Sequence, residues 1–156
     1  MDDLPAAYRE PGTAARIALV AASHVRLTGR ELVPAGGDLV GALWEAPAVI
    51  LAHGTEADPL FFFANRAALV RFDCAVEGLV GRPSRFSAEA PVREERQALL
   101  DRVKRDGFIA DYAGVRISAT GQRFRIEQAT VWNLVDEAGA LHGQAATFSR
   151  WVELGS

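Results

Sequence analysis

The stretch Arg123-Phe-Arg-Ile-Glu-Gln-Ala-Thr-Val-Trp-Asn-Leu-Val135 alternates along its length in the way of a β-strand with one buried face. The mostly apolar face of this predicted strand carries Phe124, Ile126, Gln128, Thr130, Trp132 and Leu134. The turn Asp136-Glu-Ala-Gly139 follows and predicts a hairpin. We therefore expect residues 140–153 to return as a second long strand, paired with residues 123–135.

Three further strands are expected upstream. Residues 108–118 form one, joined to the hairpin by the turn Ala119-Thr-Gly-Gln122. Residues 48–53 and 60–64 are short apolar runs, typical of buried strands, and Asp58-Pro59 marks the turn between them. The run Phe61-Phe-Phe63 points alternately to both faces of its strand, so we expect both faces to be covered.

Helices are expected before and between these strands. Residues 13–32 predict an N-terminal helix capped by Thr13, and residues 1–12, with two prolines and a glycine, predict a flexible leader. Asn65 can cap a short helix that runs to about Phe72. Pro91 can open a longer helix, which Gly107 would end.

This order predicts an α+β fold: a five-stranded antiparallel sheet with helices on one side and an additional N-terminal helix. The 156 residues suit one domain, which we place at residues 13–154, with residues 44–154 as its core. Helices that separate the first two strands from the last three are typical of the PAS fold, which this order resembles.

The charge balance argues against two classes of partner. The chain has 17 basic and 20 acidic residues, a formal net charge of −3. General binding to nucleic acid or to an anionic membrane needs concentrated positive charge, so we expect neither partner. No apolar run reaches the 18 residues of a membrane span. Cys74 is the single cysteine, which favours a reducing, cytoplasmic setting.

Several motifs resemble one known family. His53-Gly-Thr-Glu-Ala-Asp-Pro59, Ala64-Asn-Arg-Ala-Ala-Leu69, Pro83-Ser-Arg-Phe86, Gly114-Val-Arg-Ile-Ser118, Val131-Trp-Asn-Leu134 and Gly143-Gln-Ala-Ala-Thr-Phe148 are similar to the MEKHLA domain family, in one order from about residue 14 to Trp151. That family is PAS-like. It occurs free-standing in bacteria, the type that this chain resembles, and at the C-terminus of plant class III homeodomain–leucine-zipper transcription factors.

The resemblance implies a sensory or regulatory binding module that signals through dimerisation or a partner, but it brings no agreed ligand or reaction. The cofactor is therefore left unknown. Gly81-Arg-Pro-Ser-Arg-Phe86 resembles the flavin motif of light-oxygen-voltage photoreceptors, with Ser84 in place of the reactive cysteine. A hydroxyl is a far poorer nucleophile than a thiol, so we expect no covalent flavin photochemistry. A band that bleaches under blue light would contradict this. Haem is also disfavoured, because residues 88–106 contain no histidine.

The candidate ligand pocket follows from the opening strand. Gln128 and Thr130 would bring polar groups among Phe124, Ile126 and Trp132, and buried polar groups need partners. They would face either a small ligand or neighbouring protein groups. In the second case the chain would be a structural interaction domain with a filled interior. Another alternative is a small acid–base enzyme that uses His53 with Glu56 or Asp58.

Classical nucleophile and metal patterns give no stronger alternative. The chain has no Gly-x-Ser-x-Gly elbow, no His-x-x-x-His pair and no Cys-x-x-Cys pair, so no catalytic or metal residue is proposed. The apolar stripe of the predicted N-terminal helix, Ile17, Val20 and Leu27, is the candidate interface of a homodimer. The alternative is a helix that folds back on its own sheet and leaves a monomer.

Overall fold

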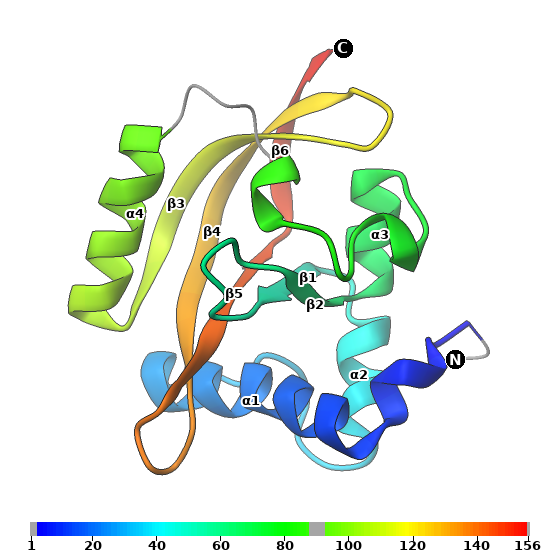
Figure 1. Ribbon diagram of the computed structural model, residues 1–156, viewed down its shortest axis with the longest axis vertical. Helices are drawn as coiled ribbons and strands as arrows, with labels where there is room; N and C mark the ends of the chain where they lie inside the picture. Colours follow the sequence, from blue (N-terminus) through cyan, green and yellow to red (C-terminus); the bar gives the residue numbers. More distant parts are fainter. Residues whose placement is uncertain (1–2, 88–92, 156) are drawn as a thin grey trace.

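The computed structural model describes residues 3–87 and 93–155, in which the expected antiparallel sheet is present (Figure 1). Its strands are β1 (Val49–His53), β2 (Phe61–Ala64), β3 (Phe108–Ile117), β4 (Arg123–Val135) and β5 (Leu141–Phe148). They are ordered β2-β1-β5-β4-β3, and a short strand β6 (Arg150–Gly155) pairs with β4. The predictions of an α+β fold and of the long hairpin are confirmed.

Helices cover both faces of the sheet. They are α1 (Pro11–Thr28), α2 (Leu39–Glu45), α3 (Arg66–Phe72) and α4 (Arg93–Asp106), with short 3-10 turns at Ala6–Arg9 (η1), Val76–Gly78 (η2) and Ser84–Ser87 (η3). Val131 packs with Val103 of α4, whereas its neighbour Trp132 packs in the cluster that contains Val20 of α1. Because adjacent strand residues point to opposite faces, α1 and α4 lie on opposite faces of the sheet.

The first two strands are buried on both faces, as the phenylalanine run predicts. Phe61 belongs to the apolar cluster on the α3 side, and Phe62 and Phe63 belong to the cluster that contains α1. Asn65 caps α3 as expected, accepting a hydrogen bond from Ala68 N at 3.0 Å. Gly107, with φ 85°, ends α4 as expected. The proposed start of that helix, Pro91, lies outside the described residues.

The leader differs from the prediction for its described part, residues 3–12. Tyr8 is 1% exposed, and its hydroxyl donates to Ala64 O at 2.8 Å and accepts from Ala64 N at 3.1 Å. The buried ring packs against Trp44 and Phe63, which holds this segment on the domain. The helix begins at Pro11 rather than after a Thr13 cap, and it ends at Thr28, where Gly29 has φ 75°.

The predicted single face of β4 is wrong, because the strand changes phase at Gln128. This residue has φ 52°, a left-handed conformation that is uncommon outside glycine. Before it, Ile126 points to the α3–α4 side; after it, Ala129 takes that side. Trp132 consequently points to α1. Gln128 itself is exposed, and its Oε1 accepts a hydrogen bond from Arg150.

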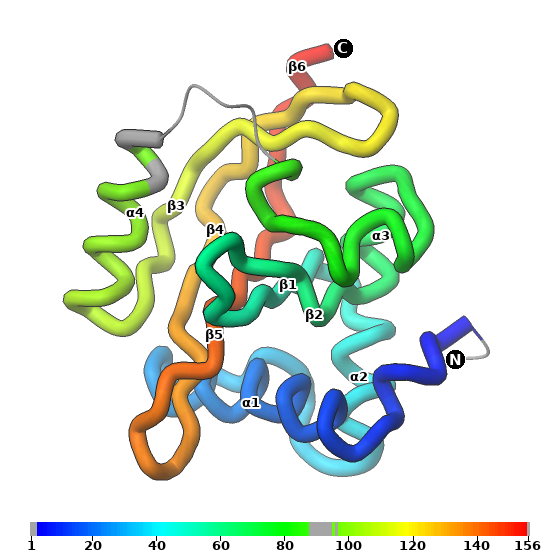
Figure 2. Tube along the Cα trace, in the orientation of Figure 1, coloured from blue at the N-terminus to red at the C-terminus, as the bar shows by residue number. Residues whose placement is uncertain are grey.

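The alternation of side chains also shifts by one residue in the two neighbours of β4, strand β3 and the β5–β6 segment, near the position of Gln128. In β3 the pairing with β4 is irregular between Ile109 and Tyr112, and both residues pack in the cluster around Val131. On the other side of β4, Phe148 of β5 contacts Trp151 of β6, three residues on. The expected continuous strand 140–153 is therefore divided at Ser149. Figures 1 and 2 show the β3–β4 hairpin curving strongly along its length.

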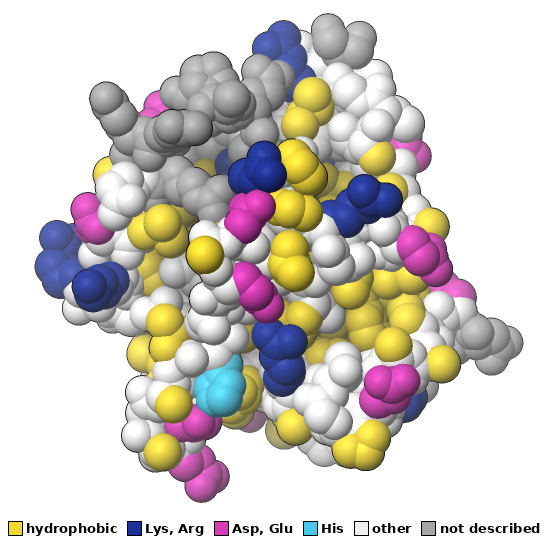
Figure 3. All heavy atoms as spheres, in the orientation of Figure 1, with side chains coloured by type: hydrophobic (Ala, Val, Ile, Leu, Met, Phe, Trp, Pro, Cys, Tyr) yellow, Lys and Arg dark blue, Asp and Glu magenta, His cyan; other side chains and the backbone are white. Residues whose placement is uncertain are grey.

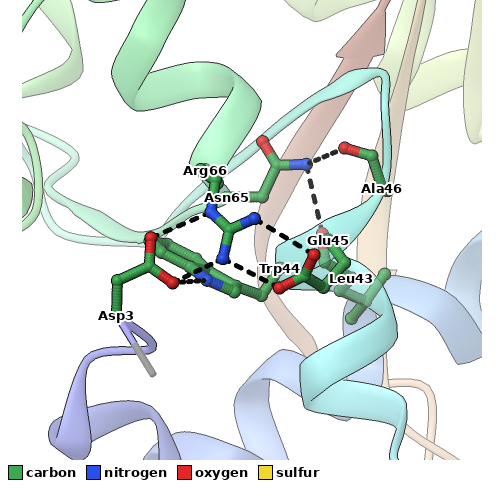
Figure 4. Close-up of polar contacts among 7 residues, drawn as sticks. All are labelled: Asp3, Leu43, Trp44, Glu45, Ala46, Asn65 and Arg66. Atoms are coloured by element: carbon green, nitrogen blue, oxygen red, sulfur yellow. Dashed lines mark hydrogen bonds and ion pairs between the residues drawn. The ribbon is translucent and has the colours of Figure 1, made fainter. Parts of the chain in front are cut away.

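Asn65 ties three elements together, and Figure 4 shows the bonds of its amide nitrogen to Leu43 O and Ala46 O. Its side-chain oxygen accepts hydrogen bonds from Ile50 N in β1 and from Ala68 N in α3. Its amide nitrogen donates to Leu43 O and Ala48 O, which flank the end of α2. Asn65 is fully buried, so this one side chain satisfies four backbone groups that have little access to water. Beside it, Arg66 pairs with Asp3 and Glu45 at the surface and holds the pKa of Asp3 down at about 2.

We predict that Asn65→Ala lowers the free energy of unfolding by about 3 kcal/mol or more, because it removes a helix cap and leaves buried backbone groups unpaired. Urea denaturation would measure this loss. Arg66→Ala is the control, and its loss should be smaller because its partners are exposed. An equal or smaller loss for Asn65→Ala would contradict the prediction.

Candidate ligand pocket

A cavity of about 580 Å³ lies between the sheet and the helical side that carries α3, η3 and α4. Its floor is the inner face of the bent strands, Ile126, Ala129, Val131, Ala146 and Phe148. Apolar side chains from the first strands and the helices complete the wall: Leu51, Phe61, Phe72, Phe86, Leu99 and Leu100. A mostly apolar cavity of this size suits a small organic molecule.

Polar groups reach the cavity from two parts of the sheet. On β3, Arg116 Nη2 donates to the Tyr112 hydroxyl at 2.8 Å. Across the sheet, His53 of β1 and Gln144 of β5 are paired neighbours that line the same cavity. Gln144 donates from its amide to Asn133 Oδ1 at 3.3 Å. Such a pattern of few polar groups among many apolar ones can orient a bound ligand.

The η3 turn supplies the Ser84 side of the cavity. Ser84 is buried and lines the cavity, and Ser87 Oγ donates to Ser84 O at 2.7 Å. Arg85 also reaches the lining, but its Nε is bound by the Asp58 carboxylate at 3.1 Å. Ser84, which stands at the cysteine position of the flavin motif that residues 81–86 resemble, therefore lies on the cavity wall. The absence of covalent flavin photochemistry stays a prediction, and its physical basis is the weak nucleophilicity of the serine hydroxyl.

The five residues predicted for the pocket separate into distinct environments. Ile126 lines the cavity. Phe124 is buried, and its ring lies edge-on to the ring of Phe72, with 5.4 Å between the two ring centres. Gln128 is exposed, for the reason given above. Thr130 lies two residues before Trp132 on the same strand, so its side chain points to the same face, toward α1.

Trp132 is a core residue on the α1 side. Its indole N–H donates to Val20 O at 3.1 Å, and its ring contacts the His24 ring at 4.7 Å. Burial lowers the pKa of His24 despite the nearby Arg30 carbonyl, which suits a neutral structural histidine.

Sequence reasoning missed most of the lining. Ala129 and Val131 fall on the polar face if the period of two is carried through Gln128, so only the phase change brings them inside. Tyr112 and Arg116 are four residues apart on one strand, so they lie on the same face and both line the cavity. This spacing could have predicted polar groups on the cavity wall.

The cavity lining does not bring together the three residues of the acid–base alternative. Glu56 Oε1 accepts from Leu60 N at 3.1 Å, and backbone hydrogen bonds lower the pKa of this carboxyl. Asp58 is held by Arg85. Neither acid belongs to the cavity lining, whereas His53 does, with its Nδ1 3.0 Å from Gly54 O. The two acids therefore stabilise the turn, and a carboxyl with a lowered pKa is a poor proton donor near neutral pH.

The candidate dimer residues are used within one chain. Ile17 and Val20 are 0% exposed and pack in the cluster that includes Trp132 and Leu134. Leu27 is partly buried against the same cluster. The helix thus covers its own sheet, as the alternative expected, and its apolar stripe offers no exposed patch for a second subunit.

Surface charge and helix hydropathy are unremarkable in the described part of the chain. On the face shown in Figure 3, basic and acidic side chains are interspersed. Residues 3–87 and 93–155 contain no helix that is long and apolar enough to cross a membrane. The same residues contain no group of three or more His, Cys, Asp or Glu side chains arranged to hold a metal ion.

Comparison with solved structures defines the class of the fold. A PAS domain from Colwellia psychrerythraea superposes with a TM-score of 0.61 at 12% identity, covering 74% of this chain and 92% of that one. The blue-light photoreceptor Vivid gives a TM-score of 0.62 at 15% identity, covering 90% and 98%. At these identities the likeness concerns the fold alone, which is PAS-like.

Sequence comparison gives the family. The model of the MEKHLA domain matches residues 14–153, and the chain belongs to this family. The homeobox-leucine zipper proteins ATHB-9 and ATHB-14 of Arabidopsis thaliana are 30% and 28% identical over 128 and 127 residues. Each match covers 80% of this chain but 15% of the plant protein, so the likeness concerns one part of those proteins.

Proposed function

We propose that this domain is a sensory or regulatory module that binds a small organic ligand in the cavity between the sheet and the α3–α4 side. The observation that carries the proposal is the 580 Å³ cavity, whose apolar wall is interrupted by a few polar side chains. A cavity of this kind favours a ligand-binding role over an interaction domain with a filled interior.

The position of the cavity supports a link between binding and signalling. Its floor consists of β4 and β5, the same strands whose opposite face carries α1. A ligand that changes the packing of Val131 acts on a strand residue adjacent to Trp132, which anchors α1. The output would be a second subunit or another protein. A reducing, cytoplasmic setting is part of the proposal, because the chain has a single cysteine, Cys74, and therefore uses no intrachain disulfide.

Native mass spectrometry of freshly purified protein tests ligand binding. We predict a bound small-molecule mass on the intact chain and its loss in Ala146→Leu, because Ala146 lines the cavity from the middle of β5. The added side chain occupies cavity volume, so the variant should melt no lower than wild-type protein from which the ligand has been removed.

Ala140→Leu is the matched control, because Ala140 is exposed in the hairpin turn. This variant should keep the bound mass. Wild-type protein that carries no bound molecule, or equal retention by the two variants, would contradict binding in this cavity.

We further propose self-association through β6 rather than through α1. Val152 and Leu154 are 40% and 38% exposed, and β6 pairs with β4 on one edge. Antiparallel pairing of two β6 strands about an axis through Val152 would set the exposed Val152 of each copy opposite the other, so two apolar side chains would meet. A second copy is therefore the occupant that this edge favours, and two-fold pairing is the commonest arrangement of soluble oligomers.

Sedimentation velocity at micromolar concentration checks this surface. We predict a dimer for the wild type and a monomer for Val152→Glu, Leu154→Glu, because the two charges would be buried between copies. Val70→Glu changes a 75% exposed valine on α3 and should remain dimeric. A monomeric wild type, or a folded double variant that stays dimeric, would remove β6 from the interface.

A further inference from the structure

Arg116 lines the cavity, and the hydrogen bonds of its guanidinium go to a carbonyl and a hydroxyl rather than to a carboxylate. Its Nη1 donates to Val115 O at 2.9 Å and its Nη2 donates to the Tyr112 hydroxyl at 2.8 Å. Both acceptors are neutral. A guanidinium has five N–H donors, so the remaining donors are available to an acceptor in the cavity.

The other charged lining residues differ from Arg116 in this respect. Arg85 forms an ion pair with Asp58. Glu95 also lines the cavity, but it is exposed, and no ion pair joins it to Arg116 in the described ranges. The charge of Arg116 is therefore not neutralised by an ion pair with any side chain that the structure describes, a set that leaves out residues 1, 2, 88–94, 96 and 156.

The local sequence of β3 holds Tyr112 against Arg116. The Tyr112 side chain extends along the strand past Gly114, where any side chain would collide with the tyrosine hydroxyl. The guanidinium carbon lies 5.4 Å from the centre of the tyrosine ring. Because the Tyr112 oxygen accepts from Arg116, its own O–H can donate to a ligand. Tyr112, Gly114 and Arg116 thus present a cation and a neutral donor side by side.

We propose that the pocket selects a small organic anion with an apolar body, whose carboxylate or equivalent group binds to Arg116 and the Tyr112 hydroxyl. The apolar body would lie along Ile126, Ala129 and Phe148, which line the same cavity. Charge-assisted hydrogen bonds from arginine are stronger than neutral ones, and a carboxylate matches the planar guanidinium. This inference rests on the proposed function, because it names the class of ligand for the same cavity.

The test uses two probes of the same shape, 2-naphthoate and the uncharged 2-naphthamide, titrated into the purified domain by calorimetry. The wild type should bind the naphthoate about tenfold or more tightly than the naphthamide, the scale expected for charge-assisted bonds. Arg116→Gln should abolish this preference while it retains binding of the naphthamide. Tyr112→Phe should reduce the preference, since it removes one donor.

Arg125→Gln is the matched control. Arg125 pairs across the strands with Val115, the neighbour of Arg116, and therefore points to the opposite face of the sheet. It should keep the full preference for the anion. A preference that persists in a folded Arg116→Gln variant would overturn the assignment to Arg116.

The remaining outcomes separate this inference from the proposed function. Equal binding of both probes by the wild type, abolished by Ala146→Leu, would overturn anion selection and leave the binding cavity supported. Binding that Ala146→Leu does not affect would place the probes elsewhere and overturn both proposals. Failure of both probes to bind would also count against both. Loss of anion preference in Tyr112→Phe alone would overturn the leading role of Arg116.

Discussion

The coordinated phase change across β3, β4 and the β5–β6 segment is the constraint on which the rest of the structure depends. It passes through Gln128, which adopts a left-handed conformation on the central strand. Side chains alternate along a strand, so one residue out of register exchanges the faces of everything that follows. Here the side chains exchange faces at neighbouring positions of adjacent strands. The sheet therefore bends there, and the strand pairing continues on both sides of Gln128.

The bend gives the two faces of the sheet different roles. On one face, Trp132 and Leu134 close against α1 in a filled core that includes Ile17 and Val20. On the other, the small side chains of Ala129 and Ala146 leave the cavity floor open below the helices. A ligand in this cavity and the α1 helix would thus contact opposite faces of the same strands. This arrangement connects the proposed binding site with a surface on which a signal could appear.

Local rules predicted those features that depend on neighbours in sequence. The Asn65 cap, the stop at Gly107 and the hairpin at residues 136–139 each follow from residues within one turn of the chain. The pocket depended on information that periodicity lacks. Nothing in the type of Gln128 indicates a positive φ, because the bend is imposed by pairing with strands far away in sequence. Arg116, an arginine on a strand, could equally have faced water; its place in the cavity follows from the pairing with Phe124.

A methyl-resolved NMR titration with 2-naphthoate tests the two-faced sheet and its cavity most directly. The account predicts shifts for the methyl groups of Ile126, Ala129 and Val131, which face the cavity. The methyl groups of Ile17 and Leu134 and the indole N–H of Trp132, on the opposite face, should show smaller shifts, because the ligand reaches them only through the strands. The largest changes on the α1 side, with the cavity methyl groups unmoved, would contradict the account.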